Sequence, residues 1–219
     1  MLAAEKNPDI QALAIRDLGT YAGPDTRALL LQYLNSTSYR NGLAEAAIRG
    51  LRAQDDPSSI DPLRDNLRQR EADYTSDGFV QGLSALAYLD RDEKDKTAVR
   101  EFLLGYVNHR KERVRLGAIN ALGALADPVA LPALEKFALA RRKSPEQRAA
   151  ASAIQNIENF RKTTEGLADL RKEFLDLQKE GQALRKDFDS LEKKVEAKAA
   201  KGSGAKKSPS AVKPPRNSS

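Results

Sequence analysis

The only histidine, His109, is the side chain with the clearest potential for chemistry in this sequence of 219 residues. It lies in the segment NHRKER, and Glu112 follows it three positions later. A zinc site of the helical HExxH type needs two imidazoles one turn apart, with a glutamate between them to activate water. The sequence has neither a second histidine nor a cysteine, so this kind of site cannot form within it. We expect His109 to be an exposed histidine at a turn between helices.

Other catalytic patterns are missing as well. The sequence contains no Cys–His pair, no glycine-rich phosphate loop and no GxSxG motif. Lone carboxylates are plentiful, but on amphipathic helices they usually form the solvated face. We therefore expect no catalytic residue, no metal and no cofactor, and we predict that the chain is not an enzyme by itself.

Two basic clusters, about one repeat apart, could in principle bind phosphate groups. Their members are Arg110, Lys111, Arg113 and Arg115 in the first and Arg141, Arg142 and Lys143 in the second. The net charge of +6 gives little support, because residues 201–219 carry five cationic side chains and no acid, which leaves about +1 for residues 1–200. The clusters also have no interleaved aromatic residues. Turns between helices with carboxylate neighbours are the simpler interpretation, and a nucleic-acid-binding edge remains an alternative.

A short phrase recurs through the first 160 residues and indicates a repeat protein. It reads AIRDL at 14–18, AIRGL at 47–51, ALAYL at 85–89, AINAL at 118–122 and AIQNI at 153–157. The leading residues Ala14, Ala47, Ala85, Ala118 and Ala153 are separated by 33, 38, 33 and 35 positions. Five occurrences at a nearly constant period predict a structural unit of about 35 residues.

Each unit carries helix signals. Asp56-Pro57, Asp127-Pro128, Ser144-Pro145 and Asn7-Pro8 combine a capping side chain with a proline at the first helical position. Pro62 and Pro132 should kink the following helix or lie in its first turn. Apolar residues fall at helical spacing in two stripes, Val99, Phe102, Leu103, Tyr106 and Val107, and Val114, Ala118, Ala121, Leu122 and Leu125. These patterns predict an all-α solenoid of about four to five antiparallel helix pairs that bury their faces against each other.

The segment GAINALGALADPVALPALEKF at 117–137 resembles the HEAT-like repeats of bacterial repeat proteins, some of them of the phycobilin-lyase type. Together with SYRNGLAEAAIRGLRAQDDPSSIDPL at 38–63, it also resembles the C-terminal HEAT-like region of zinc aminopeptidases of the aminopeptidase N family. The resemblance covers about residues 8–160. It implies a region that arches over a catalytic domain and restricts access to it. The family's HExxH and GxMEN motifs are missing, so the catalytic part would be absent from this chain.

These observations favour a non-catalytic HEAT-type scaffold whose concave helix face binds a protein or peptide. The candidate interaction face consists of the residues two positions after four of the repeat alanines, Arg16, Arg49, Asn120 and Gln155. The alternatives are a separated C-terminal cap of an aminopeptidase N-like zinc peptidase and a nucleic-acid-binding HEAT-like protein.

Beyond residue 160 the apolar spacing changes to a strict heptad. The heptad seam comprises Leu167, Leu170, Phe174, Leu177, Gly181, Leu184, Phe188, Leu191 and Val195. It predicts either a coiled coil with another chain, formed by self-association or by docking on a partner protein, or a long amphipathic helix that lies back on the solenoid. Gly181 at a core position leaves a gap in the middle of the seam.

The sequence therefore predicts three regions, a solenoid at 1–160, a long coiled-coil helix at 161–200 and a disordered tail at 201–219. The tail, KGSGAKKSPSAVKPPRNSS, contains almost nothing apolar that could offset the chain entropy lost on ordering. The N-terminus has no secretory signal pattern, and no stretch approaches the roughly 18 apolar residues of a membrane span. A cytoplasmic location is expected by default.

Overall fold

The structure is a computed structural model that describes residues 5–21, 23–139 and 144–203. Side chains are described up to residue 186, except those of residues 168, 169 and 183. Within these ranges the regular structure is helical and contains no strand. The α-helices are α1 Pro8–Leu18, α2 Pro24–Leu34, α3 Gly42–Gln54, α4 Ile60–Gln69, α5 Ser76–Leu89, α6 Thr97–Leu104, α7 Glu112–Leu125, α8 Leu131–Ala138 and α9 Pro145–Ser203. Short 3-10 turns at Tyr39–Asn41, Pro57–Ser59, Glu71–Asp73 and Pro128–Ala130 connect some of them.

The predicted start signals cap helices as expected. The side chain of Asn7 accepts a hydrogen bond from the amide of Asp9 at the start of α1. Asp56 and Asp127 do the same for the amides two positions later, and the prolines after them open 3-10 turns that lead into α4 and α8. Pro62 and Pro132 lie in the first turns of α4 and α8, where a missing amide costs no helical hydrogen bond.

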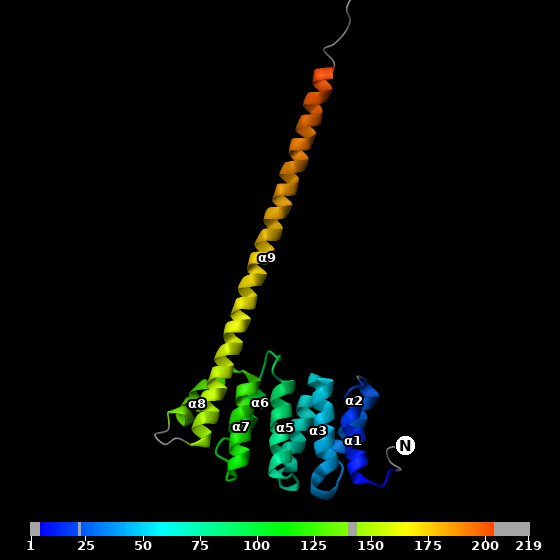
Figure 1. The fold of residues 1–219 in the computed structure, drawn as a ribbon, viewed down its shortest axis with the longest axis vertical. Coiled ribbons are helices and arrows are strands. Elements are labelled where there is room, and N and C mark those ends of the chain that lie inside the picture. Colours follow the sequence, from blue (N-terminus) through cyan, green and yellow to red (C-terminus); the bar gives the residue numbers. More distant parts are fainter. Residues whose placement is uncertain (1–4, 22, 140–143, 204–219) are drawn as a thin grey trace, which may run out of the picture. The chain divides into compact units, whose positions relative to one another are not determined.

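The helices stack in two layers, and this all-α HEAT-like solenoid is the predicted fold. Helices α1, α3, α5 and α7 stand side by side in chain order and form the odd layer, which the first turns of α9 continue (Figure 1). The even-numbered helices pack behind it, with α2 against α3, α4 against α5 and α6 against α7. The repeat alanines all lie in the odd layer, and those of α3, α5, α7 and α9 are buried.

Both predicted apolar stripes face the core. All five residues of the α7 stripe are buried, as are Val99, Phe102, Leu103 and Val107, while Tyr106 is half-buried. Leu122 has no exposed surface, and one core cluster runs from Ile15 in α1 to Ile157 in α9. The period of the pattern thus identified the buried side of these helices correctly.

Close backbone approach holds the odd layer together. A Cβ on Gly19, at the end of α1, would lie 2.4 Å from the carbonyl oxygen of Gly50 in α3. A Cβ on Gly123 of α7 would lie 2.7 Å from the Cα of Ala153 in α9. At these positions any larger residue would push neighbouring helices apart, because packed interiors have no spare volume.

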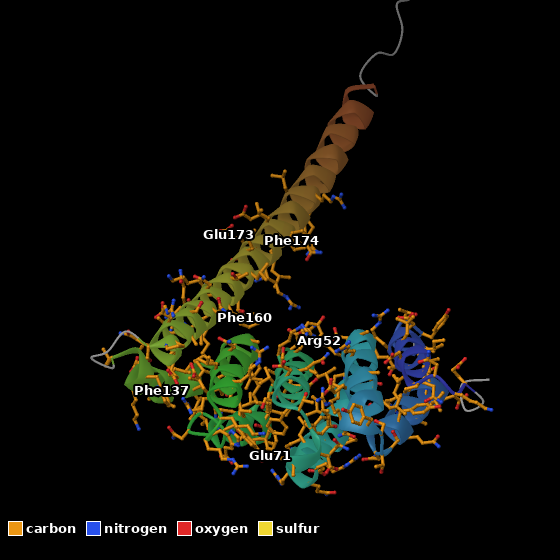
Figure 2. The ribbon with its side chains drawn as sticks, turned by 60° about the horizontal axis from the view of Figure 1, so that its bottom comes forward. Arg52, Glu71, Phe137, Phe160, Glu173 and Phe174 are labelled. Atoms are coloured by element: carbon orange, nitrogen blue, oxygen red, sulfur yellow. The ribbon has the colours of Figure 1, made fainter. Side chains whose placement is uncertain are left out.

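Ion pairs link successive repeats. Asp56 and Asp127 have a second role besides capping, since each accepts from an arginine of the preceding even helix. The Nη1–Oδ2 distances are 2.6 Å for Arg27–Asp56 and 2.7 Å for Arg100–Asp127. At the same end of the odd helices, the guanidinium of Arg52, labelled in Figure 2, lies 4.7 Å from the ring centroid of Tyr88.

Helix α9 is one continuous helix from Pro145 to Ser203. It begins as the last helix of the odd layer and extends past the predicted end at 200, and residues 204–219 of the predicted tail lie outside the described part. The chain divides into two compact units, Met1–Thr164 and Glu165–Ser219. Residues 160 and 200 as region boundaries therefore stay predictions.

Candidate functional site

Two of the four candidate interaction residues come together in a groove between α1 and α3. Arg16 of α1 and Arg49 of α3 line this α1–α3 groove, which encloses about 280 Å³. Its apolar floor includes Ala12 and Ala46, and Leu13 contributes a side chain that is 50% exposed. The other lining residues are Asp9, Gly42 and Glu45.

The charges of the groove differ in how they are satisfied. Arg16 donates from Nη2 to its neighbour Asp17, with a distance of 2.8 Å to Oδ1. Glu45 accepts a hydrogen bond of 3.0 Å from the Thr75 hydroxyl. Arg49 makes no hydrogen bond or ion pair with any residue that the structure describes. Its guanidinium is therefore the cation of this groove that can bind an incoming carboxylate without first losing a partner.

The other two candidate residues do not join the groove. Asn120 of α7 and Gln155 of α9 are both exposed and lie further along the odd layer. The equivalent residue of α5, Ala87, is fully buried. The position two after the repeat alanine is thus on the surface in α1, α3, α7 and α9 but faces the interior in α5.

The sequence reasoning missed the groove's apolar floor and its acids. Leu13 and Ala46 each directly precede a repeat alanine, and Ala12 and Glu45 each lie two positions before one. This shared position relative to the repeat alanines is a sequence signal for the groove residues. Whether these residues line one groove depends on how closely α1 approaches α3, which the sequence alone does not state.

The repeat family is established by sequence comparison. A family model described as HEAT repeats matches residues 1–84 and 81–155, which together cover more than half of the chain. The chain belongs to the HEAT repeat family. Comparison with curated proteins gave no match. Among the described helices of this HEAT protein, none is both long and apolar enough to cross a bilayer.

His109, predicted to be exposed, is instead mostly enclosed between two HEAT repeats, with 14% of its side chain accessible. Its Nδ1 accepts from the amide of Lys111 at 3.2 Å, so Nε2 carries the proton and donates to Oε1 of Glu71 at 3.1 Å. The Tyr106 hydroxyl donates to Oε2 of the same carboxylate at 3.2 Å. Glu71, labelled in Figure 2, thus accepts from two side chains of the next repeat.

This His–Tyr–Glu cluster links two HEAT repeats. The Tyr106 ring packs 5.1 Å from the rings of both Phe79 and Phe102. Burial, reinforced by the negative charge of Glu71, raises the pKa of Tyr106 to about 12. In the part of the chain that the structure covers, no three histidine or carboxylate side chains gather closely enough to hold a metal ion.

The first basic cluster is partly neutralised by carboxylates of neighbouring HEAT repeats. Arg115 donates from Nη2 to Oε1 of Glu146 at 2.7 Å, and this hydrogen bond lowers the pKa of Glu146. Arg113 pairs with Asp77 of α5. The second cluster, at 141–143, lies outside the described residues.

Proposed function

We propose that this chain is a non-catalytic HEAT-repeat scaffold that binds a segment of another protein along the exposed side of the odd layer. The observation that carries the proposal is the α1–α3 groove, where a guanidinium with no partner among the described residues stands beside exposed apolar surface. Arg49 would bind a carboxylate of the partner, and Leu13 with Ala46 would take an adjacent apolar side chain. A rigid helical surface of this kind is how solenoid proteins commonly recognise extended partners.

Asn120 and Gln155 extend the proposed surface along α7 and α9. Their side chains are exposed amides that both donate and accept hydrogen bonds, which suits contacts with the backbone of a bound segment. The buried Ala87 of α5 leaves the middle of the layer without an equivalent polar contact. The proposal therefore assigns the main affinity to the α1–α3 groove and a lesser contribution to the later helices.

Selection from a displayed peptide library against the purified full chain tests the proposal, and it does not require the partner to be identified first. Selected peptides should combine an acidic residue with a neighbouring apolar one. Their affinity, measured by fluorescence polarisation, should fall about tenfold or more for Arg49→Ala, since a charge-assisted hydrogen bond is lost. Leu13→Lys should weaken binding as well.

The matched control is Arg110→Ala, which removes an exposed arginine at the turn between α6 and α7. It should leave the affinity unchanged. Peptides that bind Arg49→Ala and wild type equally would contradict the assignment to this groove. Failure to select any saturable ligand would contradict the scaffold function itself.

The two alternative functions stay predictions. The matching family describes HEAT repeats in general and does not distinguish the C-terminal cap of an aminopeptidase N-like zinc peptidase from other arrays. An HExxH motif in the same reading frame upstream of Met1 would favour that cap. Nucleic-acid binding loses support because Arg113 and Arg115 already pair with carboxylates.

A further inference from the structure

The heptad seam of α9 presents an unusually apolar surface. Its described leucine and phenylalanine side chains are 63–74% exposed. They are Leu167, Leu170, Phe174, Leu177 and Leu184, and Phe174 is labelled in Figure 2. The later positions Phe188, Leu191 and Val195 have side chains outside the described set and enter only as positions of the sequence pattern. Apolar surface of this extent on a helix is typical of an association site.

We propose that a second copy of this chain covers the seam, and that the two helices run antiparallel with Gly181 of one opposite Leu184 of the other. The strict heptad over 167–195 identifies the occupant as another helix of the same period, and a copy of this chain supplies one. This proposal does not depend on the α1–α3 groove, which involves other helices.

The sizes of the core residues favour the antiparallel arrangement. In a parallel pair each core residue faces its own equivalent, so Gly181 would face Gly181 and Phe174 would face Phe174. The core would then be empty at Gly181 and crowded at Phe174, and both conditions destabilise packed helices. In the antiparallel register every glycine or phenylalanine position stands opposite a leucine position, with Phe174 opposite 191 and Gly181 opposite 184.

The flanking charges favour the same register. In the antiparallel register Arg171 stands opposite Glu192, and Glu173 stands opposite Lys194. These two attractive pairs outnumber the one repulsive pair, Glu180 with Asp187. In a parallel pair, the attraction of Glu180 with Arg185 is offset by the repulsion of Asp187 with Glu192. Because each combination occurs twice by symmetry, the antiparallel dimer gains a net attraction that the parallel dimer lacks.

Distances between spin labels decide the orientation. The sequence has no cysteine, so Lys172→Cys gives one label per chain. In the proposed register the labels on the two chains are 21 residues apart along the axis of the helix pair, which is about 30 Å at 1.5 Å per residue. Parallel helices would leave no separation along the pair axis, so the same labels would be separated only across the width of the two helices, about 20 Å. The control is Gln182→Cys, which lies close to the two-fold axis and should give a short distance in either orientation.

Two charge reversals on the full-length protein provide an independent test by sedimentation equilibrium. Arg171→Glu would place a glutamate opposite Glu192 and should weaken dimerisation about tenfold. Lys172→Glu makes the same change on the outer side of the helix and should have no effect. Leu184→Lys should abolish dimerisation, because it puts a charge beside the Gly181 gap. A short Lys172 label distance, or equal effects of Arg171→Glu and Lys172→Glu, would overturn the antiparallel register. Wild-type protein that remains monomeric at tens of micromolar would overturn the whole proposal.

Discussion

Replacement of Asp90 by asparagine should stabilise the protein at neutral pH. Asp90 follows the last residue of α5 and is only 3% exposed, and its Oδ2 has no hydrogen-bond partner among the described residues. Lys96, whose positive charge acts on this carboxyl, donates to the carbonyl oxygen of Leu125 at 2.8 Å. Burial raises the pKa of Asp90 from its ordinary 3.8 to about 6. The positive charge of Lys96 opposes this rise, and the carboxylates of Glu93, Asp95 and Asp127 add to it.

The size of the effect follows from linkage between protonation and folding. Because the folded state holds the Asp90 proton more tightly than the unfolded chain does, the free energy of unfolding falls as pH rises from about 4 to about 6, and then levels off. At 1.36 kcal/mol per pKa unit, the raised pKa of Asp90 lowers the free energy of unfolding by about 3 kcal/mol at pH 7.5 and by about 1 kcal/mol at pH 4.5. Asparagine has nearly the same shape and carries no charge, so it avoids this cost.

Urea denaturation of wild type and Asp90→Asn at several pH values between 4.5 and 7.5 measures the effect. The variant should gain stability progressively as pH rises. Asp92→Asn is the control, since that side chain is 69% exposed, and its substitution should give no such trend. A stability difference between Asp90→Asn and wild type that stays the same at both ends of the range would refute the argument that burial of this carboxyl destabilises the fold.

Three further predictions concern the stability of the repeats, and urea denaturation at neutral pH tests each of them. Leu122→Ala removes a fully buried side chain of α7 and should cost about 2–5 kcal/mol, and a loss below about 0.5 kcal/mol would contradict its place in the core. Gly123→Ala forces α7 away from Ala153 and should cost about 1–3 kcal/mol, whereas Gly166→Ala, with nothing within 4 Å, should be neutral or slightly stabilising. Equal effects of the two alanines would argue against close approach of α7 and α9. Asp127→Ala removes both a helix cap and the ion pair with the α6 arginine, so it should cost about 2–4 kcal/mol, more than loss of a cap alone.

The local features of the fold could be read from the sequence because their causes are local. The capping side chains of Asn7, Asp56 and Asp127 act on amides two positions away, and the apolar stripes follow from the 3.6-residue period of a helix. The repeat alanines marked the odd layer for a related reason, since a small residue recurring at the same helical position suits close packing. These patterns were sufficient to predict an all-α solenoid of stacked helix pairs and the position of its core, and the resemblance of two segments to a known family added the HEAT type.

The candidate site was only partly predictable, because it depends on which side chains from different repeats meet. The sequence placed Arg16 and Arg49 on one surface, and the structure brings them together in a groove. It did not reveal that Arg49 has no partner among the described residues while Arg16 binds Asp17. The expectation that the residue two positions after a repeat alanine is exposed was wrong in α5, where that residue, Ala87, is buried.

What the sequence by itself determined is therefore the helices, their caps, the repeat and the heptad seam, all of which arise from spacings within one or two helices. Only the tertiary structure decided that Glu71 accepts from His109 and that Asp127 pairs with Arg100, because these partners lie in different repeats. The physical reason is that contacts between repeats depend on how far each helix is rotated and how closely it approaches its neighbours. Those quantities are set by packing on several sides at once, so no single periodic pattern along the chain specifies them.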